Sequence, residues 1–186
     1  MKTTLNAIRK HEPCADGWEK LLTYLGKTKA DDEPLAITTI IDSNGLDDAI
    51  WCLQAVEGYD KEIRLYAVWC ARQVQHLLTD QRSLDALDVA ERYANGDATD
   101  AELTAARDAA WAAAWDVART ADRIAALAAS AARAAASDAA YWAARAAVWA
   151  AARAAVWDAV WSAAEGARDE MGQRQEAELR RICEGD

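Results

Sequence analysis

Histidine, cysteine and carboxylate side chains lie close together in the sequence at two places where catalysis or metal binding must be weighed. His76 and Asp80 are four residues apart, so on a helix the carboxylate would orient the imidazole, although this pair is also common on solvated helix faces. His11, Glu12 and Cys14 are too close together and too few for a zinc site. No glycine-rich phosphate loop occurs either. The sequence therefore predicts a non-enzymatic protein with no catalytic residue, no metal site and no cofactor.

The cysteines show no pairing pattern. They are Cys14, Cys52, Cys70 and Cys183. Without a CxxC pair or a histidine at ligand spacing, they are typical of reduced thiols in an intracellular protein. The start of the sequence, MKTTLNAIRKHEPC, lacks the apolar run of a secretory signal, and charged residues interrupt the apolar stretch 139–164. We therefore expect a cytoplasmic protein without a membrane span.

The balance of charge limits the choice of partner. Acidic side chains outnumber basic ones by 31 to 21, which gives a formal net charge of −10. This balance argues against general nucleic-acid binding, because affinity for phosphates comes from clustered lysine and arginine. It suits a protein whose partner is basic. The carboxylates expected to be most accessible to such a partner form two runs, Asp31, Asp32 and Glu33, and Asp47 and Asp48.

A second group of candidate residues is aromatic or basic. The helix expected from 60 to about 78 carries an apolar stripe and, roughly opposite, a stripe formed by Leu65, Trp69, Arg72 and His76. If this helix lies inside a bundle, the second stripe is packing, with its polar members satisfied by nearby acids. If the helix is peripheral, the stripe is a binding patch. Trp51 points away from the apolar row of its own helix, towards another helix or a partner. With the two acidic runs, the predicted partner-binding residues are Trp51, Trp69, Arg72 and His76.

The segment 97–165 sets the main constraint on architecture. It contains no glycine or proline and six of the nine tryptophans, and about half of it is alanine. As one helix, at about 1.5 Å per residue, it would reach roughly 100 Å, so it must fold back on itself. The expected breaks are Thr120 before Asp122 and Ser137 before Asp138, which leave helices of about 20, 16 and 28 residues.

Arginine repeatedly precedes tryptophan by four residues in this segment, which places a guanidinium over an indole on the next helical turn. Arg107 is expected to contact Trp111. A longer row consists of Arg145, Trp149, Arg153, Trp157 and Trp161. The row is either a recognition surface, because both residue types are frequent at binding hot spots, or core packing between alanine faces.

The remaining helices are expected at 15–26, 34–42, 46–56, 60–78, 83–94 and 168–183. Ser83 is the expected N-cap of the fifth, and Thr99 with Glu102 forms a capping box. The β-branched run 35–41 would permit a strand, but no second strand is evident to pair with it. The C-terminal helix has only Met171, Leu179 and Ile182 to bury, so we expect weak docking.

These elements predict an all-α fold, a single compact helical bundle of about seven to nine helices. Nothing resembling a flexible linker divides the chain, so 1–186 is expected to be one domain. Within it, short helices occupy 15–96, the Ala/Trp/Arg-rich long helices occupy 97–165, and a polar helix occupies 167–183.

Three consecutive runs in the middle of the chain resemble the Imm-5-like immunity proteins. They are SNGLDDAIWCLQAV at 43–56, EIRLYAVWCARQVQHLLTD at 62–80 and SLDALDVAERYANGDATDAEL at 83–103, and the similarity extends over roughly residues 16–183. The resemblance implies an all-helical, non-enzymatic protein that protects a bacterium by binding a toxin; similar proteins are also carried by phages. It supplies no established binding residues. The residues within its signature are Trp51, Arg64, Trp69, Arg72, Gln73, His76, Arg92 and Tyr93.

The leading functional hypothesis is therefore a cytoplasmic immunity protein that inhibits a toxin or effector, with acidic side chains facing a basic partner. Two alternatives remain open. One is a structural assembly protein in which Trp-rich helices join identical subunits. The other is a phage counter-defence protein that mimics nucleic acid or sequesters a nucleotide in a pocket of tryptophan and arginine.

Overall fold

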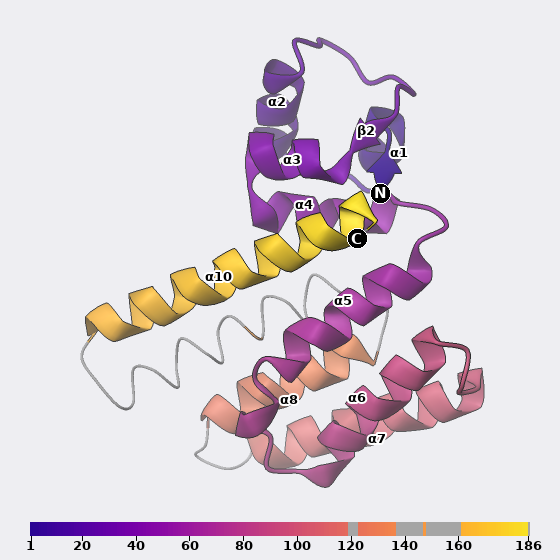
Figure 1. The fold of residues 1–186 in the computed structure, drawn as a ribbon, viewed down its shortest axis with the longest axis vertical. Coiled ribbons are helices and arrows are strands. Elements are labelled where there is room, and N and C mark those ends of the chain that lie inside the picture. The colour runs from indigo at the N-terminus through magenta and orange to yellow at the C-terminus, as the bar shows by residue number, and fades with distance from the viewer. Residues whose placement is uncertain (119–122, 137–146, 148–160, 186) are drawn as a thin grey trace. The chain divides into compact units, whose positions relative to one another are not determined.

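The computed structural model describes residues 1–118, 123–136, 147 and 161–185 (Figure 1). In these residues the chain is all-α apart from one small two-stranded sheet, which confirms the predicted fold class. The chain divides into two compact units, Met1–Asp60 with Glu176–Asp186, and Lys61–Gln175. The predicted arrangement as one domain stays a prediction. No helix of the described ranges is both long and apolar enough to cross a bilayer.

The first unit is built from short elements. In chain order they are β1 (Lys2–Thr3), α1 (Leu5–Lys10), α2 (Ala15–Tyr24), β2 (Leu35–Ala36), α3 (Ile37–Asn44), α4 (Leu46–Cys52) and the 3-10 helix η1 (Leu53–Ala55), followed by the last part of α10 (Trp161–Glu184). Leu5, Ile8, Ile37, Ile40 and Leu179 are each at most 1% exposed and form the centre of its core. The predicted positions of α2, α3 and α4 are confirmed to within a few residues.

The prediction that the β-branched run has no strand to pair with is wrong. β1 and β2 pair antiparallel, with Lys2 opposite Ala36 and Thr3 opposite Leu35. A two-residue ladder is too short to be stable alone, so flanking contacts must hold it. The Thr3 hydroxyl donates to the carbonyl of Ala55, and the amide of Ile37 donates to the carbonyl of Met1 at 3.3 Å.

Helix α1 has no counterpart among the predicted elements. The hydroxyl of Thr4 accepts a hydrogen bond from the amide of Ala7 at 3.0 Å and so caps the helix. Leu5 and Ile8, three residues apart, place their side chains in the core. A helix of only six residues has too few turns for its periodicity to stand out in the sequence.

The second unit contains longer helices. They are α5 (Asp60–Arg72), the 3-10 helix η2 (Gln75–Leu77), α6 (Gln81–Ala94), α7 (Asp100–Ala118), α8 (Arg123–Ala135) and the first part of α10. Helices α6, α7 and α8 pack against one another, as Figure 1 shows. The helix predicted to run to about Leu78 ends instead at Arg72, and a 3-10 turn follows it.

The two predicted caps have different outcomes. The capping box is confirmed, because the Thr99 amide donates to Glu102 Oε2 at 2.7 Å and the Glu102 amide donates to Thr99 Oγ1 at 3.2 Å. Arg92 Nη2 also donates to Glu102 Oε1, at 3.1 Å. The prediction that Ser83 caps α6 is wrong. The cap is Asp80, whose Oδ1 accepts from the Arg82 amide at 2.9 Å, so the helix begins two residues earlier than Ser83.

The alanine-rich segment is described as two helices in its first half. Helix α7 is described as far as Ala118 and α8 from Arg123, so the first predicted break, Thr120 before Asp122, lies outside the described residues. Helix α8 ends at Ala135, just before the second predicted break; that break at Ser137 and Asp138 lies outside the described residues. Some alanine side chains of each helix are fully buried, among them Ala110 and Ala113 of α7 and Ala131 and Ala132 of α8, which allows close packing.

The predicted contact between Arg107 and Trp111 is wrong. The guanidinium over the Trp111 ring belongs to Arg133 of α8, 4.6 Å from the ring centroid. Arg107 Nε instead lies 3.5 Å from Oδ1 of Asp108. Because α8 packs along α7, a partner from the neighbouring helix reaches the indole. The rest of the predicted arginine–tryptophan row, 145–161, lies outside the residues whose side chains are described.

Helix α10 begins at Trp161 and continues through Gly166, so it starts earlier than the predicted Arg168. Its buried side chains include Met171 and Leu179, as expected, and also Gln175, which is only 1% exposed. Tyr66 Oη donates to the carbonyl of Gln175 at 3.3 Å. The helix therefore docks through polar as well as apolar contacts.

Candidate functional site

The predicted partner-binding residues are divided between the two units. Asp31, Asp32, Glu33, Asp47, Asp48 and Trp51 belong to the first unit, and Trp69, Arg72 and His76 belong to the second. They therefore form separate groups.

The acidic run 31–33 closes the loop between α2 and β2. Lys27 Nζ lies 2.6 Å from Asp31 Oδ2 and 2.7 Å from Glu33 Oε2. The Asp31 carbonyl accepts a hydrogen bond from the amide of Asn6 at 3.0 Å, which ties the loop to α1. Asp32 is exposed and has no ion pair within the described ranges. Of this run, only Asp32 is available to a partner without breaking an internal contact.

The pKa shifts agree with this arrangement. Hydrogen bonds to Asp31 and then Glu33 raise the pKa of Lys27 above its ordinary value. The hydrogen bond from Lys27 is also the main reason that the pKa of Asp31 is lowered. Both groups therefore remain ionised, and their charges largely cancel at this loop.

The second acidic run lies in the first turn of α4. Asp48 Oδ2 accepts from Asn44 Nδ2 at 2.8 Å, and the same amide donates to the carbonyl of Gly17 at 2.8 Å. Asp48 thus joins the α3–α4 corner to α2. The Asp47 side chain is exposed, and Trp51, on the same helix, is half-buried. Of this run, Asp47 is the carboxylate that faces solvent.

Trp69 and His76, two members of the predicted stripe, lie in different surroundings. The Trp69 ring stacks on Tyr66 with centroids 6.5 Å apart and an interplanar angle of 11°. His76 lies on η2 and is exposed. The proposed partner of its imidazole, Asp80, pairs instead with Arg82, whose Nη2 lies 2.7 Å from Asp80 Oδ2. The carboxylate needed to orient His76 is thus engaged elsewhere.

Arg72 connects α5 to α6. Its Nη2 lies 2.9 Å from Asp88 Oδ1 and also contacts Glu91 Oε2, and its Nη1 donates to Gln75 Oε1 at 3.2 Å. Burial acts to lower the pKa of Arg72, but hydrogen bonds to Asp88 and Glu91 outweigh it, so the pKa is raised. This guanidinium is held by internal carboxylates, as in the packing alternative.

Other residues of the segment that resembles Imm-5-like proteins also make contacts within the second unit. The Arg64 guanidinium lies 4.9 Å from the Tyr93 ring centroid, and Tyr93 Oη donates to Asp100 Oδ1 at 2.7 Å. Arg174 Nη2 on α10 donates to Gln73 Oε1 at 2.6 Å. These contacts link α5 to α6, the start of α7 to α6, and α10 to the end of α5. These side chains of the segment that resembles Imm-5-like proteins therefore mainly stabilise the second unit.

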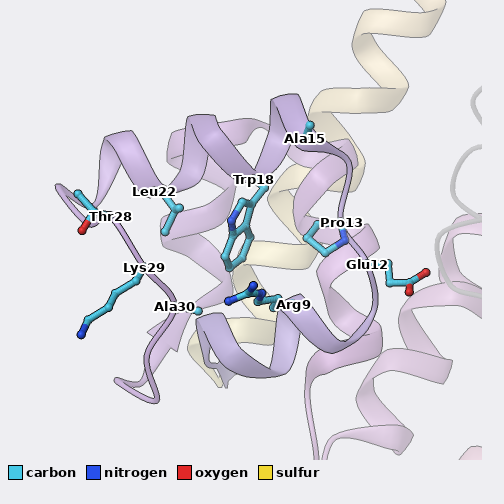
Figure 2. Close-up of a pocket in the computed structure, with 9 residues that line it drawn as sticks. All are labelled: Arg9, Glu12, Pro13, Ala15, Trp18, Leu22, Thr28, Lys29 and Ala30. Atoms are coloured by element: carbon cyan, nitrogen blue, oxygen red, sulfur yellow. The ribbon is translucent and has the colours of Figure 1, made fainter.

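A feature that sequence reasoning missed lies between α1 and α2. An open depression of about 490 Å³ is lined by Arg9, Glu12, Pro13, Ala15, Trp18, Leu22, Thr28, Lys29 and Ala30. Figure 2 shows the Trp18 indole and the Arg9 guanidinium pointing toward one another at its centre. Trp18 is half-buried, whereas Arg9 and Lys29 are exposed.

Arg9 also lines a second depression. It too measures about 490 Å³ and is lined by Asn6, Arg9, Lys10 and Asp32. The two depressions on either side of Arg9 are together called here the α1–α2 groove. The chain can reverse between α1 and α2 because Glu12 adopts a left-handed conformation with φ of 55°.

The groove carries three cations and two carboxylates, Glu12 and Asp32. Arg9, Lys10 and Lys29 line it, and none of these three has an ion pair within the part of the chain that the structure describes. The sequence signal available for it was Trp18, a tryptophan within the segment that forms α2. The basic residues come from α1 and from the loop after α2, so only folding brings them to the indole.

The groups with potential for redox or metal chemistry are isolated. All four cysteines lie in described residues and none forms a disulfide. Burial raises the pKa of the Cys52 thiol to about 12 and also raises that of Cys183. Among the described side chains, no group of three or more His, Cys, Asp or Glu is arranged to hold a metal ion.

Comparison with known proteins gives no further assignment. The chain matches no family model, and no characterised protein or solved structure is significantly similar to it.

Proposed function

We propose that this chain is a non-enzymatic immunity protein that binds a protein toxin or effector in the cytoplasm and blocks its active or docking surface. The resemblance of segment 43–103 to Imm-5-like immunity proteins supports this proposal. The contacts of Arg64, Arg72 and Tyr93 support it indirectly, because residues of the shared signature build the second unit and so make a shared fold physically reasonable.

The observation that carries the proposal is the α1–α2 groove. Its walls consist largely of exposed side chains, so it would cover only a small part of a small-molecule substrate. A surface of this kind is suited to another macromolecule, and a half-buried tryptophan beside an arginine is a frequent anchor of protein interfaces. The groove thus favours binding over catalysis.

The test is protection against a toxin encoded beside this gene. Cells that express the candidate toxin are co-transformed with the wild-type chain, and survival is measured together with capture of the toxin by the purified chain. We expect protection and stable capture at physiological salt. Absence of any captured protein partner at both low and physiological salt would contradict the proposal.

The purified protein also distinguishes the alternative functions. In sedimentation, an assembly protein would stay oligomeric on micromolar dilution, whereas an inhibitor needs no association with itself. Thermal stabilisation by a panel of nucleotides would favour sequestration of a nucleotide over toxin binding. An unchanged melting temperature across the panel, together with toxin capture, would support the immunity function.

A further inference from the structure

We infer that the α1–α2 groove binds an acidic, extended segment of a protein partner. This inference rests on the proposed function only in taking the ligand to be a protein. The polarity at this surface is the reverse of the one predicted from net charge, in which acidic side chains of this chain face a basic partner.

The charged side chains of the groove favour an acidic ligand. The chain has a net charge of −10, yet the groove gathers Arg9, Lys10 and Lys29. Elsewhere in the first unit, Lys27 pairs with Asp31 and Glu33, and Arg180 Nη2 pairs with Asp42 Oδ1 at 2.7 Å. The three cations of the groove have no such pairs within the described residues. An incoming carboxylate can therefore pair with them without breaking an internal ion pair.

The shape of the groove suits an extended segment. Arg9 lines both depressions, so the residues that line the groove extend from Leu22 and Thr28 on one side to Lys10 on the other. An extended chain can follow such a path, whereas a compact ligand would fill one depression and stay exposed. The half-buried indole of Trp18 offers an apolar contact beside Arg9 (Figure 2). A segment with an apolar side chain flanked by carboxylates matches both features.

The carboxylates of this chain limit the net charge of the partner. Glu12 and Asp32 also line the groove, and the whole chain is acidic, so a uniformly acidic partner would be repelled. The acidic segment must therefore belong to a protein that is otherwise neutral or basic. Because the groove is exposed, the attraction is screened by salt, and binding should weaken as ionic strength rises.

The test uses the full chain and defined probe peptides. The isotope-labelled protein is titrated with acetyl-Glu-Glu-Leu-Glu-Glu-amide and with the matched peptide in which lysine replaces glutamate, and chemical shifts are followed by NMR. We expect the acidic peptide to shift the Trp18 indole and the amides of 9–10 and 28–30, and the lysine peptide to leave them unchanged.

Charge-reversal variants provide the control. Arg9→Glu and Lys29→Glu together should weaken the acidic peptide by roughly tenfold or more. Lys20→Glu reverses an exposed lysine of α2 that does not line the groove and should change the affinity by less than about twofold. The spectrum of each variant without peptide verifies that it is folded.

Three outcomes would overturn the inference: equal binding of the lysine peptide, shifts confined to other surfaces, or equal loss with Lys20→Glu. Tighter binding of inorganic phosphate or AMP at the same residues would also overturn it, because the groove would then be a small-anion site. If the peptide fails while the chain still captures and blocks a toxin, the groove assignment fails and the proposed function stands. If the peptide binds as expected but no toxin is captured, the groove assignment stands and the proposed function fails.

Discussion

The Arg72 guanidinium on α5 donates from Nε to Oε2 of Glu91 on α6 at 3.1 Å. With its further bond to Asp88, one turn away on the same helix, Arg72 neutralises two carboxylates that would otherwise repel each other. A residue that sequence patterning offered as a binding candidate is therefore a cross-link between two helices.

Replacing Arg72 with alanine should destabilise the protein by about 1 to 2 kcal/mol, since charge-assisted bonds are lost and the two α6 carboxylates are left unpaired. Arg72→Lys should recover only part of this, because an ammonium cannot reproduce the planar fork. The measurement is the midpoint of urea unfolding. His76→Ala is the matched control: its side chain is exposed, so a loss as large as that of Arg72→Ala would contradict the assignment.

The cap of α6 makes stability depend on pH. The hydrogen bond from Arg82 lowers the pKa of Asp80 below its ordinary value of 3.8. Folding therefore favours the ionised carboxylate, and this contribution is present above the unfolded pKa and lost as pH falls through the folded pKa. We expect Asp80→Asn to be less stable than wild type at pH 7, with the difference shrinking toward pH 3. Asp80→Ala should lose about 1 kcal/mol more, because it also removes the capping acceptor. Equal pH profiles for Asp80→Asn and wild type would contradict this assignment.

Ser83 is fully buried, and its hydroxyl makes no hydrogen bond to any residue that the structure describes. Ser83→Ala should therefore leave the free energy of unfolding unchanged or raise it by up to about 1 kcal/mol. Thr99 provides the contrast, because its hydroxyl is used in the capping box and Thr99→Ala should cost about 1 kcal/mol. Thermal and urea unfolding of both variants measure the difference. A clear loss in Ser83→Ala would mean that the hydroxyl has a partner.

Two helical glycines should respond oppositely to alanine. A Cβ at Gly172 meets nothing within 4 Å, so Gly172→Ala should stabilise by about 0.5 to 1 kcal/mol through helix propensity. A Cβ at Gly17 would lie 2.9 Å from Asp48 Oδ2 and 3.1 Å from Cys14 Sγ. Moving Asp48 would break its bond to Asn44, so Gly17→Ala should destabilise by about 1 to 2 kcal/mol. Stabilisation by both changes would show that the α2–α4 contact is loose.

The C-terminal helix should matter more than its polar sequence indicates. Leu179 is completely buried, and Leu179→Ala should cost about 2 to 4 kcal/mol by leaving a cavity in the first unit. Ile182 is only half-buried, and Ile182→Ala should cost less than about 1.5 kcal/mol. Urea unfolding of the two variants tests this. Similarly small losses of stability in both variants would support weak docking of the C-terminal helix.

Much of the fold could be predicted because its signals are local. Helix periodicity and the capping box at Thr99 act over a few residues, and both are found where they were predicted. The pairing of β1 with β2 was missed because the partners are more than 30 residues apart and each strand is too short to leave a pattern. The contact of Arg133 with Trp111 was missed because it depends on how two helices pack.

The candidate site shows the same division. Composition and periodicity by themselves determined an acidic, helical chain rich in arginine and tryptophan. Tertiary structure alone decided which cations pair internally, as Arg72 does, and which line the groove without an ion pair to any described residue, as Arg9 and Lys29 do. The physical reason is that an ion pair depends on the distance between two atoms, and residues far apart in the sequence acquire that distance only when the chain folds.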